Sequence, residues 1–278
     1  MQYSAIVPAH FLSRPNRFIA RVELEGQVLN VHVKNTGRCA ELLRPGCTVY
    51  LQPGSNPTRK TPYDLIAVDK DGLLVNMDSA APNQAVAEWL AAGGIGPLDE
   101  LRAEYKVGAS RFDFFARRGE EKILMEVKGC TLEENGFARF PDAPTLRGLK
   151  HVEELATLAG QGWRCYVMIL LQMEGMKQFS PNWATHPDFG HALRRAVEAG
   201  VTLLTYDCRV TPSSLTVNAP VPADLTPPND LPYFYFTTER ARLAAERALF
   251  LPAGMVAARK MCYTEKNSLF QCFSKAEV

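Results

Sequence analysis

Two short runs, residues 111–115 and 125–128, constrain the fold of this chain more than any other feature. The first reads Arg-Phe-Asp-Phe-Phe and the second Met-Glu-Val-Lys, and both have the composition of strands. The polar stretch between them, residues 118–121, contains Gly119. A two-residue turn that begins with glycine suits type II′, because its first central residue needs a positive φ. The sequence therefore predicts a β-hairpin.

The predicted turn also sets the register of the hairpin. Successive side chains on a strand point to opposite faces, so Phe112 and Phe114 are both expected on one apolar face. The other face then gathers four charged side chains: Asp113, Glu126, Lys128 and Arg111. In this register Asp113 lies directly opposite Glu126.

The facing pair Asp113 and Glu126 is unusual, because like charges opposite each other destabilise a sheet. A divalent cation between the carboxylates would remove that problem, since hard cations take oxygen ligands. Lys128 points the same way as Glu126, where its charge could stabilise a phosphate. Asp, followed by Glu-x-Lys on the next strand, is the pattern of the PD-(D/E)XK nuclease superfamily. A solvated polar strand face is the alternative that the pattern leaves open.

Composition narrows the class of protein. Hydrophobic residues make up 46% of the 278 residues and charged residues 22%, as in ordinary globular proteins. The longest apolar run, residues 165–171, is far shorter than the about 20 residues that span a bilayer. Seven cysteines without a Cys-x-x-Cys pair argue against a zinc ribbon or a disulfide framework. With no visible signal peptide, we expect a cytoplasmic protein without a membrane partner.

The N-terminal part of the chain is predicted to be a small β-domain. Alternation indicates five short strands, over residues 18–24, 28–33, 48–52, 63–69 and 72–76. A short helical piece is expected over residues 39–43, before Arg-Pro-Gly. Some five strands in fewer than ninety residues suit a small barrel such as an OB-fold, and a small sandwich fits nearly as well.

The rest of the chain is predicted to form a mixed α/β domain with an appendage. Helices are expected over residues 85–92, 146–158 and 189–199, and strands over 165–171 and 201–206, in addition to the hairpin. A proline-rich stretch from residue 220 reads as a linker. The predicted domains are residues 1–83, residues 84–219, and a linker with a C-terminal extension over residues 220–278.

Six stretches of the sequence resemble the sugar fermentation stimulation proteins. The most specific is residues 140–151, Phe-Pro-Asp-Ala-Pro-Thr-Leu-Arg-Gly-Leu-Lys-His; the others are residues 32–38, 43–46, 75–79, 106–113 and 126–128 with Thr131. The resemblance extends over about residues 15–217. It implies an OB-fold-like N-terminal domain, a PD-(D/E)XK nuclease-like C-terminal domain of the α/β (α+β) class, and DNA binding with a role in sugar metabolism.

The resemblance also implies roles at the hairpin. Asp113 and Glu126 would be the metal ligands, and Mg²⁺ (or Mn²⁺) is the expected ion because it binds few carboxylates and keeps several waters. Lys128 would position the attacking water or stabilise the transition state. Glu88 is the candidate for an additional catalytic carboxylate and Glu104 its rival, although a surface glutamate is the competing interpretation of either.

Eight further residues are predicted to contact nucleic acid: Arg17, Lys34, Arg38, Arg111, Thr145, Arg147, Lys150 and His151. Thr145 could cap the helix that follows it, and Arg147 would lie in its first turn, where a positive charge is unfavourable unless an anion is near. The competing interpretation is a capped helix with a solvated arginine, and a structural role for His151.

These observations favour a DNA-binding protein whose second domain is a magnesium-dependent nuclease. RNA is an alternative substrate, and the oligomeric state is left open. A non-catalytic DNA-binding regulator on a nuclease-like scaffold is the second hypothesis. A protein that binds a sugar or nucleotide metabolite is the third, because the net charge of +1 gives no overall attraction to nucleic acid.

Overall fold

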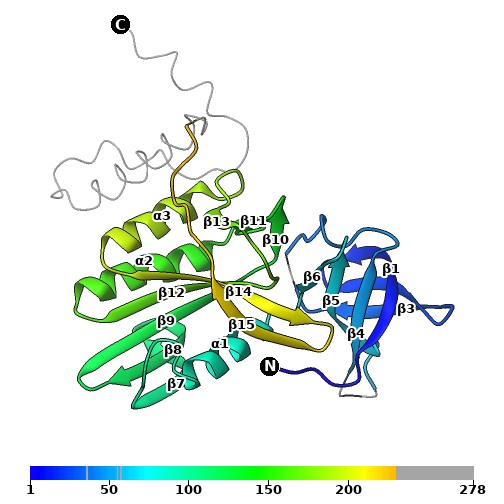
Figure 1. Cartoon of the computed structure of the whole chain (residues 1–278), viewed down its shortest axis with the longest axis horizontal. Helices are drawn as coiled ribbons and strands as arrows, with labels where there is room; N and C mark the ends of the chain where they lie inside the picture. The colour runs from blue at the N-terminus through cyan, green and yellow to red at the C-terminus, as the bar shows by residue number, and fades with distance from the viewer. Residues whose placement is uncertain (36, 55, 57, 230–278) are drawn as a thin grey trace, which may run out of the picture. The chain divides into compact units, whose positions relative to one another are not determined.

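A computed structural model describes residues 1–229, apart from residues 36, 55 and 57. The described residues belong to one compact unit, Met1–Leu231. This unit contains a β-barrel followed by a layered α/β region (Figure 1). The sequence also predicts a helix over residues 239–249 in the C-terminal extension, and most of this extension lies outside the described residues.

Five strands close the barrel: β1 (Val7–Asn16), β2 (Ile19–Leu24), β3 (Gln27–Val33), β4 (Thr48–Pro53) and β5 (Tyr63–Lys70). Neighbours β1–β2, β2–β3, β1–β4 and β4–β5 are antiparallel, and β3–β5 is parallel. This is the Greek-key barrel of the OB-fold, so the barrel prediction is confirmed over the sandwich. β6 (Leu73–Asn76) adds to β5.

The sequence prediction missed β1 and placed a helix at residues 39–43. Prolines at positions 8 and 15 disguise β1, because proline removes a backbone donor and normally interrupts a strand. β1 tolerates them with register shifts against β2. Residues 39–43 form a single turn, in which the Leu43 N–H donates to the Cys39 carbonyl at 3.0 Å. Pro45 and Gly46 end this turn before a longer helix can form.

A six-stranded sheet forms the centre of the second region, in the order β15-β14-β12-β9-β8-β7. Its strands are β7 (Glu100–Val107), β8 (Ser110–Arg118), β9 (Glu121–Cys130), β12 (Arg164–Leu171), β14 (Thr202–Thr211) and β15 (Ser214–Pro220). The three middle strands, β9, β12 and β14, are parallel, and each edge is antiparallel. The expected mixed α/β fold is therefore observed.

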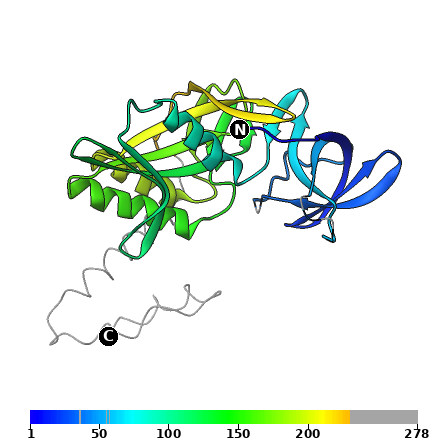
Figure 2. The ribbon, with the colours of Figure 1, turned by 90° about the horizontal axis from the view of Figure 1, so that it is seen from below.

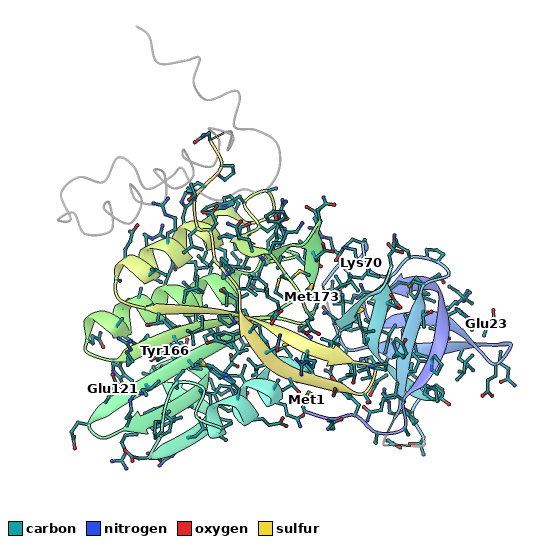
Figure 3. The ribbon with its side chains drawn as sticks, viewed as in Figure 1. Met1, Glu23, Lys70, Glu121, Tyr166 and Met173 are labelled. Atoms are coloured by element: carbon teal, nitrogen blue, oxygen red, sulfur yellow. The ribbon has the colours of Figure 1, made fainter. Side chains whose placement is uncertain are left out.

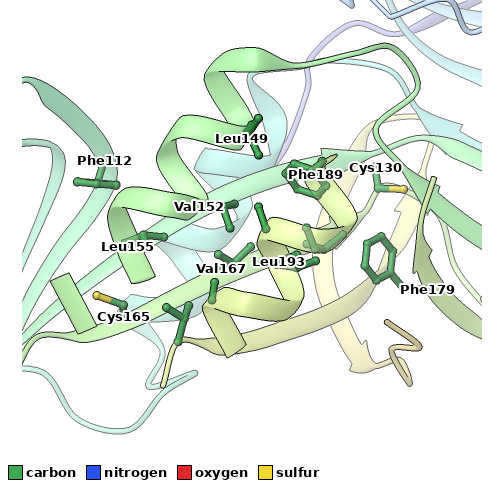
Figure 4. Close-up of a cluster of buried hydrophobic side chains, with 14 of the residues drawn as sticks. Phe112, Cys130, Leu149, Val152, Leu155, Cys165, Val167, Phe179, Phe189 and Leu193 are labelled. Carbon is green, nitrogen blue, oxygen red and sulfur yellow. The ribbon is translucent and has the colours of Figure 1, made fainter. Parts of the chain in front are cut away.

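Helices cover both faces of this sheet (Figures 1 and 2). α1 (Ala81–Ala91) packs on one face, and α2 (Leu146–Gly160) and α3 (Pro187–Glu198) pack on the other. Burial on both faces explains why β12 is apolar at nearly every position. Figure 4 shows the core under α2 and α3, with side chains including Phe112, Val152, Leu155, Val167, Phe189 and Leu193. A small second sheet contains β10 (Leu132–Glu134), β11 (Phe137–Phe140) and β13 (Gln178–Pro181).

The predicted hairpin is present with its predicted register. Phe114 pairs with Met125 and Arg118 pairs with Glu121. Gly119 has a φ of +57°, as the predicted turn requires. The paired ladder ends at Phe114. Asp113 and Glu126 were expected to lie opposite each other, but they are not paired in this ladder.

The expectation that Phe112 and Phe114 share a face is wrong. Phe112 packs under α2 and α3, whereas Phe114 packs against α1. The alternation changes next to Glu104, which lies between the pairs Ala103–Phe114 and Tyr105–Phe112 and has a φ of +59°. That left-handed backbone interrupts the pleat of the neighbouring strand. Both faces are apolar, so neither phenylalanine is left exposed.

Direct contacts join the barrel to the sheet region. Lys70 of β5 forms an ion pair with Glu133 of β10, and its ammonium also donates to the Glu133 carbonyl at 2.7 Å. Met173, which follows β12, packs into the barrel core (Figure 3). Gln172 donates to the Asn76 side chain at 2.9 Å.

The predicted linker begins as a packed segment. Val221 is buried, and its N–H donates to the Thr205 carbonyl at 2.8 Å. The Phe179 N–H donates to the Pro222 carbonyl at 2.8 Å, so the chain extends the small sheet here. Within residues 1–229 as described, none of the helices is both long and apolar enough to span a membrane.

Candidate active site

Glu126 on β9 is a carboxylate held inside the protein. Its side chain is 3% exposed, and its Oε1 accepts from His151 Nδ1 at 2.5 Å and from the Lys128 ammonium. Its Oε2 is buried and has no hydrogen-bond partner among the residues that the structure describes. A buried carboxylate oxygen without a partner is costly to the folded state.

His151 and Lys128, the two partners of Glu126, determine its charge state. Burial raises the pKa of its carboxyl. The hydrogen bonds and charges of His151 and Lys128 lower this pKa by more than burial raises it, so the net shift is downwards. The carboxylate is therefore ionised at neutral pH. Lys128 is itself largely buried and is held by this contact.

Asp113 on β8 has a different environment. Its Oδ1 accepts from Asn83 Nδ2 at 2.8 Å, and its Oδ2 accepts from the Val127 N–H at 2.7 Å. Burial and the negative charge of Glu126 raise the pKa of the Asp113 carboxyl, and these two hydrogen bonds only partly offset the rise. The charge of Glu126 thus contributes to the pKa of Asp113, although the two residues are not paired in the ladder.

The cluster contains few donors for a metal ion. Among the described residues, no group of three or more His, Cys, Asp and Glu side chains is arranged to hold a metal. Asp113 and Glu126 nevertheless suit an ion that binds two protein carboxylates and keeps most of its waters. The unpartnered Glu126 Oε2 and the repulsion between the carboxylates are the features that such an ion would relieve.

The N-terminal turns of α2 lie beside this cluster. Thr145 caps the helix, since its hydroxyl accepts from the Gly148 N–H at 3.1 Å. Arg147 is exposed and lies one turn before His151, on the same side of the helix. Lys150 is exposed and forms an ion pair with Glu154 at 3.6 Å. His151 is buried and forms a hydrogen bond with Glu126, so its side chain is not exposed for contact with nucleic acid.

Glu88 and Glu104 are not directed to the carboxylate pair. The Glu88 carboxylate accepts from the Met1 ammonium at 2.7 Å. Glu88 is five residues after Asn83, which on a helix places the two on different sides, and Asn83 contacts Asp113. The Glu104 carboxylate forms an exposed ion pair with Arg111 at 2.8 Å. The helix therefore contributes an amide to the site where a carboxylate was expected.

Three predicted nucleic-acid contacts on the barrel have protein partners. Lys34 forms an ion pair with the buried Asp78. The Arg38 guanidinium donates to the Asp142 carbonyl at 3.0 Å, although 65% of its side chain stays exposed. Arg17 lies over the ring of Phe18, with 5.7 Å between the guanidinium carbon and the ring centroid.

Sequence reasoning missed the role of Asn83. It lies in the first turn of α1, just after Pro82. No local pattern distinguishes it from a helix-starting asparagine, because its partner is 30 residues away on β8. Only the docking of α1 against the sheet reveals the contact.

Comparison with known proteins supports the assignment of both regions. Residues 12–77 match the family model described as the SfsA N-terminal OB domain, and residues 80–214 match the sugar fermentation stimulation protein RE domain. The domain limits at residues 83 and 219 stay predictions.

Relatives with the same description cover most of this chain. A sugar fermentation stimulation protein homolog of Desulfitobacterium hafniense (strain Y51) is 50% identical over 77% of this chain and 94% of its own length. One from Ruminiclostridium cellulolyticum is 47% identical over 76% of this chain and 93% of its own length. The solved structure of Pyrococcus furiosus SfsA in complex with Ca²⁺ matches with a TM-score of 0.73 and 26% identity, over 81% of this chain and 98% of that one. The chain belongs to the sugar fermentation stimulation protein family.

Proposed function

We propose that this protein is a divalent-metal-dependent phosphodiesterase that acts on DNA. The observation that carries the proposal is the buried Oε2 of Glu126, which has no partner among the described residues, beside the Asp113 carboxyl, whose pKa is raised by burial and by the charge of Glu126. Two carboxylates that repel each other are costly to a fold that gains nothing from them, even with Lys128 on the same strand as Glu126.

Asp113 and Glu126 would hold the ion, and Mg²⁺ or Mn²⁺ is the proposed physiological choice. The Ca²⁺ complex of Pyrococcus furiosus SfsA supports a divalent ion in a related protein. When bound, such an ion supplies Lewis acidity toward a phosphate oxygen and lowers the pKa of a coordinated water.

The chain's own residues perform the remaining tasks. His151 donates to Glu126 Oε1 and so fixes the orientation of that carboxylate. Lys128 lies on the same edge of β9, where its ammonium can exchange the Glu126 oxygen for a phosphate oxygen and stabilise charge that develops in the transition state.

Contact with DNA is proposed for the exposed start of α2. Arg147 has a fixed positive charge on the same side of the helix as His151, so a phosphate that reaches Glu126 would pass close to it. Lys150 and the exposed part of Arg38 add positive charge to this surface. Phosphate contacts of this kind are independent of base sequence and sensitive to salt.

A cleavage assay tests the catalytic proposal. Purified protein is incubated with supercoiled plasmid, single-stranded DNA and RNA, in Mn²⁺, Mg²⁺ or EDTA. We expect metal-dependent cleavage that Glu126→Gln or Asp113→Asn reduces by about 100-fold or more, because each removes a ligand charge at the reacting phosphate. Asp64→Asn, in the barrel, is the matched control and is expected to cleave like wild type. Equal cleavage by wild type and Asp113→Asn would refute the catalytic proposal.

A DNA-binding protein without turnover is the second candidate, and the Lys128–Glu126 contact favours it. The lysine is already occupied by the carboxylate that it would otherwise assist. This candidate predicts DNA binding that survives Glu126→Gln. Arg147→Ala should weaken binding to all sequences and reduce the slope of log K against log salt by about 1. Binding that neither Arg147→Ala nor salt affects would exclude both candidates.

A further inference from the structure

We infer that Asn83 is a positioning residue of the metal site, acting through Asp113. The inference deepens the proposed function and rests on its metal site. Asn83 is on α1, outside the hairpin that supplies the two carboxylates, and its amide Nδ2 donates to Asp113 Oδ1 at 2.8 Å.

Asp113 is fixed at both oxygens. The Val127 N–H holds Oδ2 from the neighbouring strand, and Asn83 holds Oδ1 from the helix. A carboxylate held at two points cannot rotate freely, yet each oxygen retains a lone pair for a cation. Ligating carboxylates commonly depend on such supporting hydrogen bonds, which are costly to remove.

The helix that carries Asn83 is itself anchored at its start. Asp78 Oδ1 accepts from the Ala80 N–H at 2.9 Å, just before α1 begins. Asp78 is 2% exposed and forms an ion pair with Lys34, which follows β3 of the barrel. Contacts with the barrel thus help to hold the start of α1, and the start of α1 places Asn83 next to Asp113.

Through Asn83, α1 contributes an amide to the carboxylate pair and not a third carboxylate. An amide N–H directed at Asp113 Oδ1 neutralises part of its charge without binding a cation itself. An aspartate of the same size would instead add repulsion in the ion-free protein and a further ligand in the ion-bound protein. The identity of this one side chain therefore controls how strongly the fold depends on the ion.

Mn²⁺ binding by the full chain tests this role, measured by titration calorimetry after treatment with EDTA and dialysis. We expect Asn83→Ala to raise the Kd for Mn²⁺ by about 10-fold or more. Gln84→Ala, the exposed neighbour on the same helix, is the control and should bind like wild type. A purely structural contact would lower the thermal midpoint without changing the Kd, so an unchanged Kd in Asn83→Ala overturns the inference.

Asn83→Asp gives a second readout that does not depend on catalysis. In EDTA this variant should unfold at a lower temperature than wild type, and Mn²⁺ should raise its midpoint by more than it raises that of wild type. Equal midpoints in EDTA with equal Mn²⁺ shifts would show that Asn83 does not act on Asp113. A wild-type chain that binds no Mn²⁺ refutes the metal site itself, and this inference with it; wild-type binding with an unaffected Asn83→Ala refutes the role of Asn83 alone.

Discussion

Two aspartates, one in each region of the molecule, show how the same side chain acquires opposite properties. Asp64 in the barrel accepts from Arg59 Nη2 at 2.6 Å and from His32 Nδ1 at 3.0 Å. Burial raises the pKa of Asp64, but the hydrogen bonds and charges of Arg59 and His32 outweigh it and the net shift is downwards. Asp113 in the sheet region has a carboxylate as its charged neighbour in place of an arginine, and its pKa is raised.

The difference lies in the partners that each region supplies to its aspartate. The barrel neutralises Asp64 with its own side chains, so this group needs nothing from solution. In the sheet region the hydrogen-bond partners of Asp113, the Asn83 amide and the Val127 N–H, are uncharged, and among the described residues Glu126 Oε2 has no hydrogen-bond partner.

The largest effect on stability is expected at Glu126. Glu126→Ala would leave Lys128 and His151 buried without their shared anion, and breaking a buried pair costs about 3 kcal/mol or more. Urea denaturation at pH 7 in EDTA would measure the loss. Asp64→Ala in the barrel is the comparison, and should cost less because Arg59 and His32 keep access to water. Equal losses at the two sites would contradict the distinction drawn between them.

A smaller effect of opposite sign is expected at Asp113. Its raised pKa means that the ionised group disfavours the folded state at neutral pH, so stability is lost as pH rises through the folded-state pKa. Asp113→Asn should therefore stabilise the ion-free protein at pH 7, by less than Glu126→Ala destabilises it. Asn83 can rotate its amide to donate or accept, so the contact can be kept.

Thermal unfolding in EDTA from pH 7 down to pH 4 would follow this gain. It should shrink as the wild-type carboxyl becomes protonated, and it should reverse when Mn²⁺ is added, because the variant loses a ligand. An Asp113→Asn protein that is less stable than wild type in EDTA at pH 7 would argue against repulsion between the two carboxylates.

The smallest effect is expected for Asp64→Asn, with the sign reversed. The lowered pKa of Asp64 contributes stability that is present above its unfolded-state pKa and is lost as pH falls through the folded-state pKa. The variant should lose less than about 1 kcal/mol at pH 7, because the ion pair is only partly buried. Its difference from wild type should vanish in acid, and Mn²⁺ should not change it. A Mn²⁺-dependent difference at Asp64 would place a second cation site in the barrel.

Much of the architecture was predictable from local patterns. The strands of the barrel other than β1, the three helices and the hairpin register follow from alternation, helical spacing and turn chemistry, which act over a few residues. The misses occurred where a longer-range effect prevails. β1 is a strand in spite of its prolines, because β2 and β4 pair with it on both sides.

The candidate site was predictable only in part, for the same reason. Asp113, Glu126 and Lys128 belong to one hairpin, so their approach follows from the register of a turn. Glu88 was predicted on the correct helix but on the wrong side of it, since helix phase relative to a sheet depends on packing. His151 and Lys34 were predicted to contact nucleic acid, with a structural role left open for His151, and each is the partner of a buried carboxylate.

Local sequence was enough to predict that two carboxylates and a lysine share one hairpin, because turn geometry and strand alternation are properties of neighbouring residues. The partners of these groups depend on packing between segments that are distant in the chain. His151 reaches Glu126 from α2 and Asn83 reaches Asp113 from α1, each across at least 25 positions of the chain. Those contacts exist because apolar faces of the helices dock on the sheet, and the polar partners are carried into place by that burial.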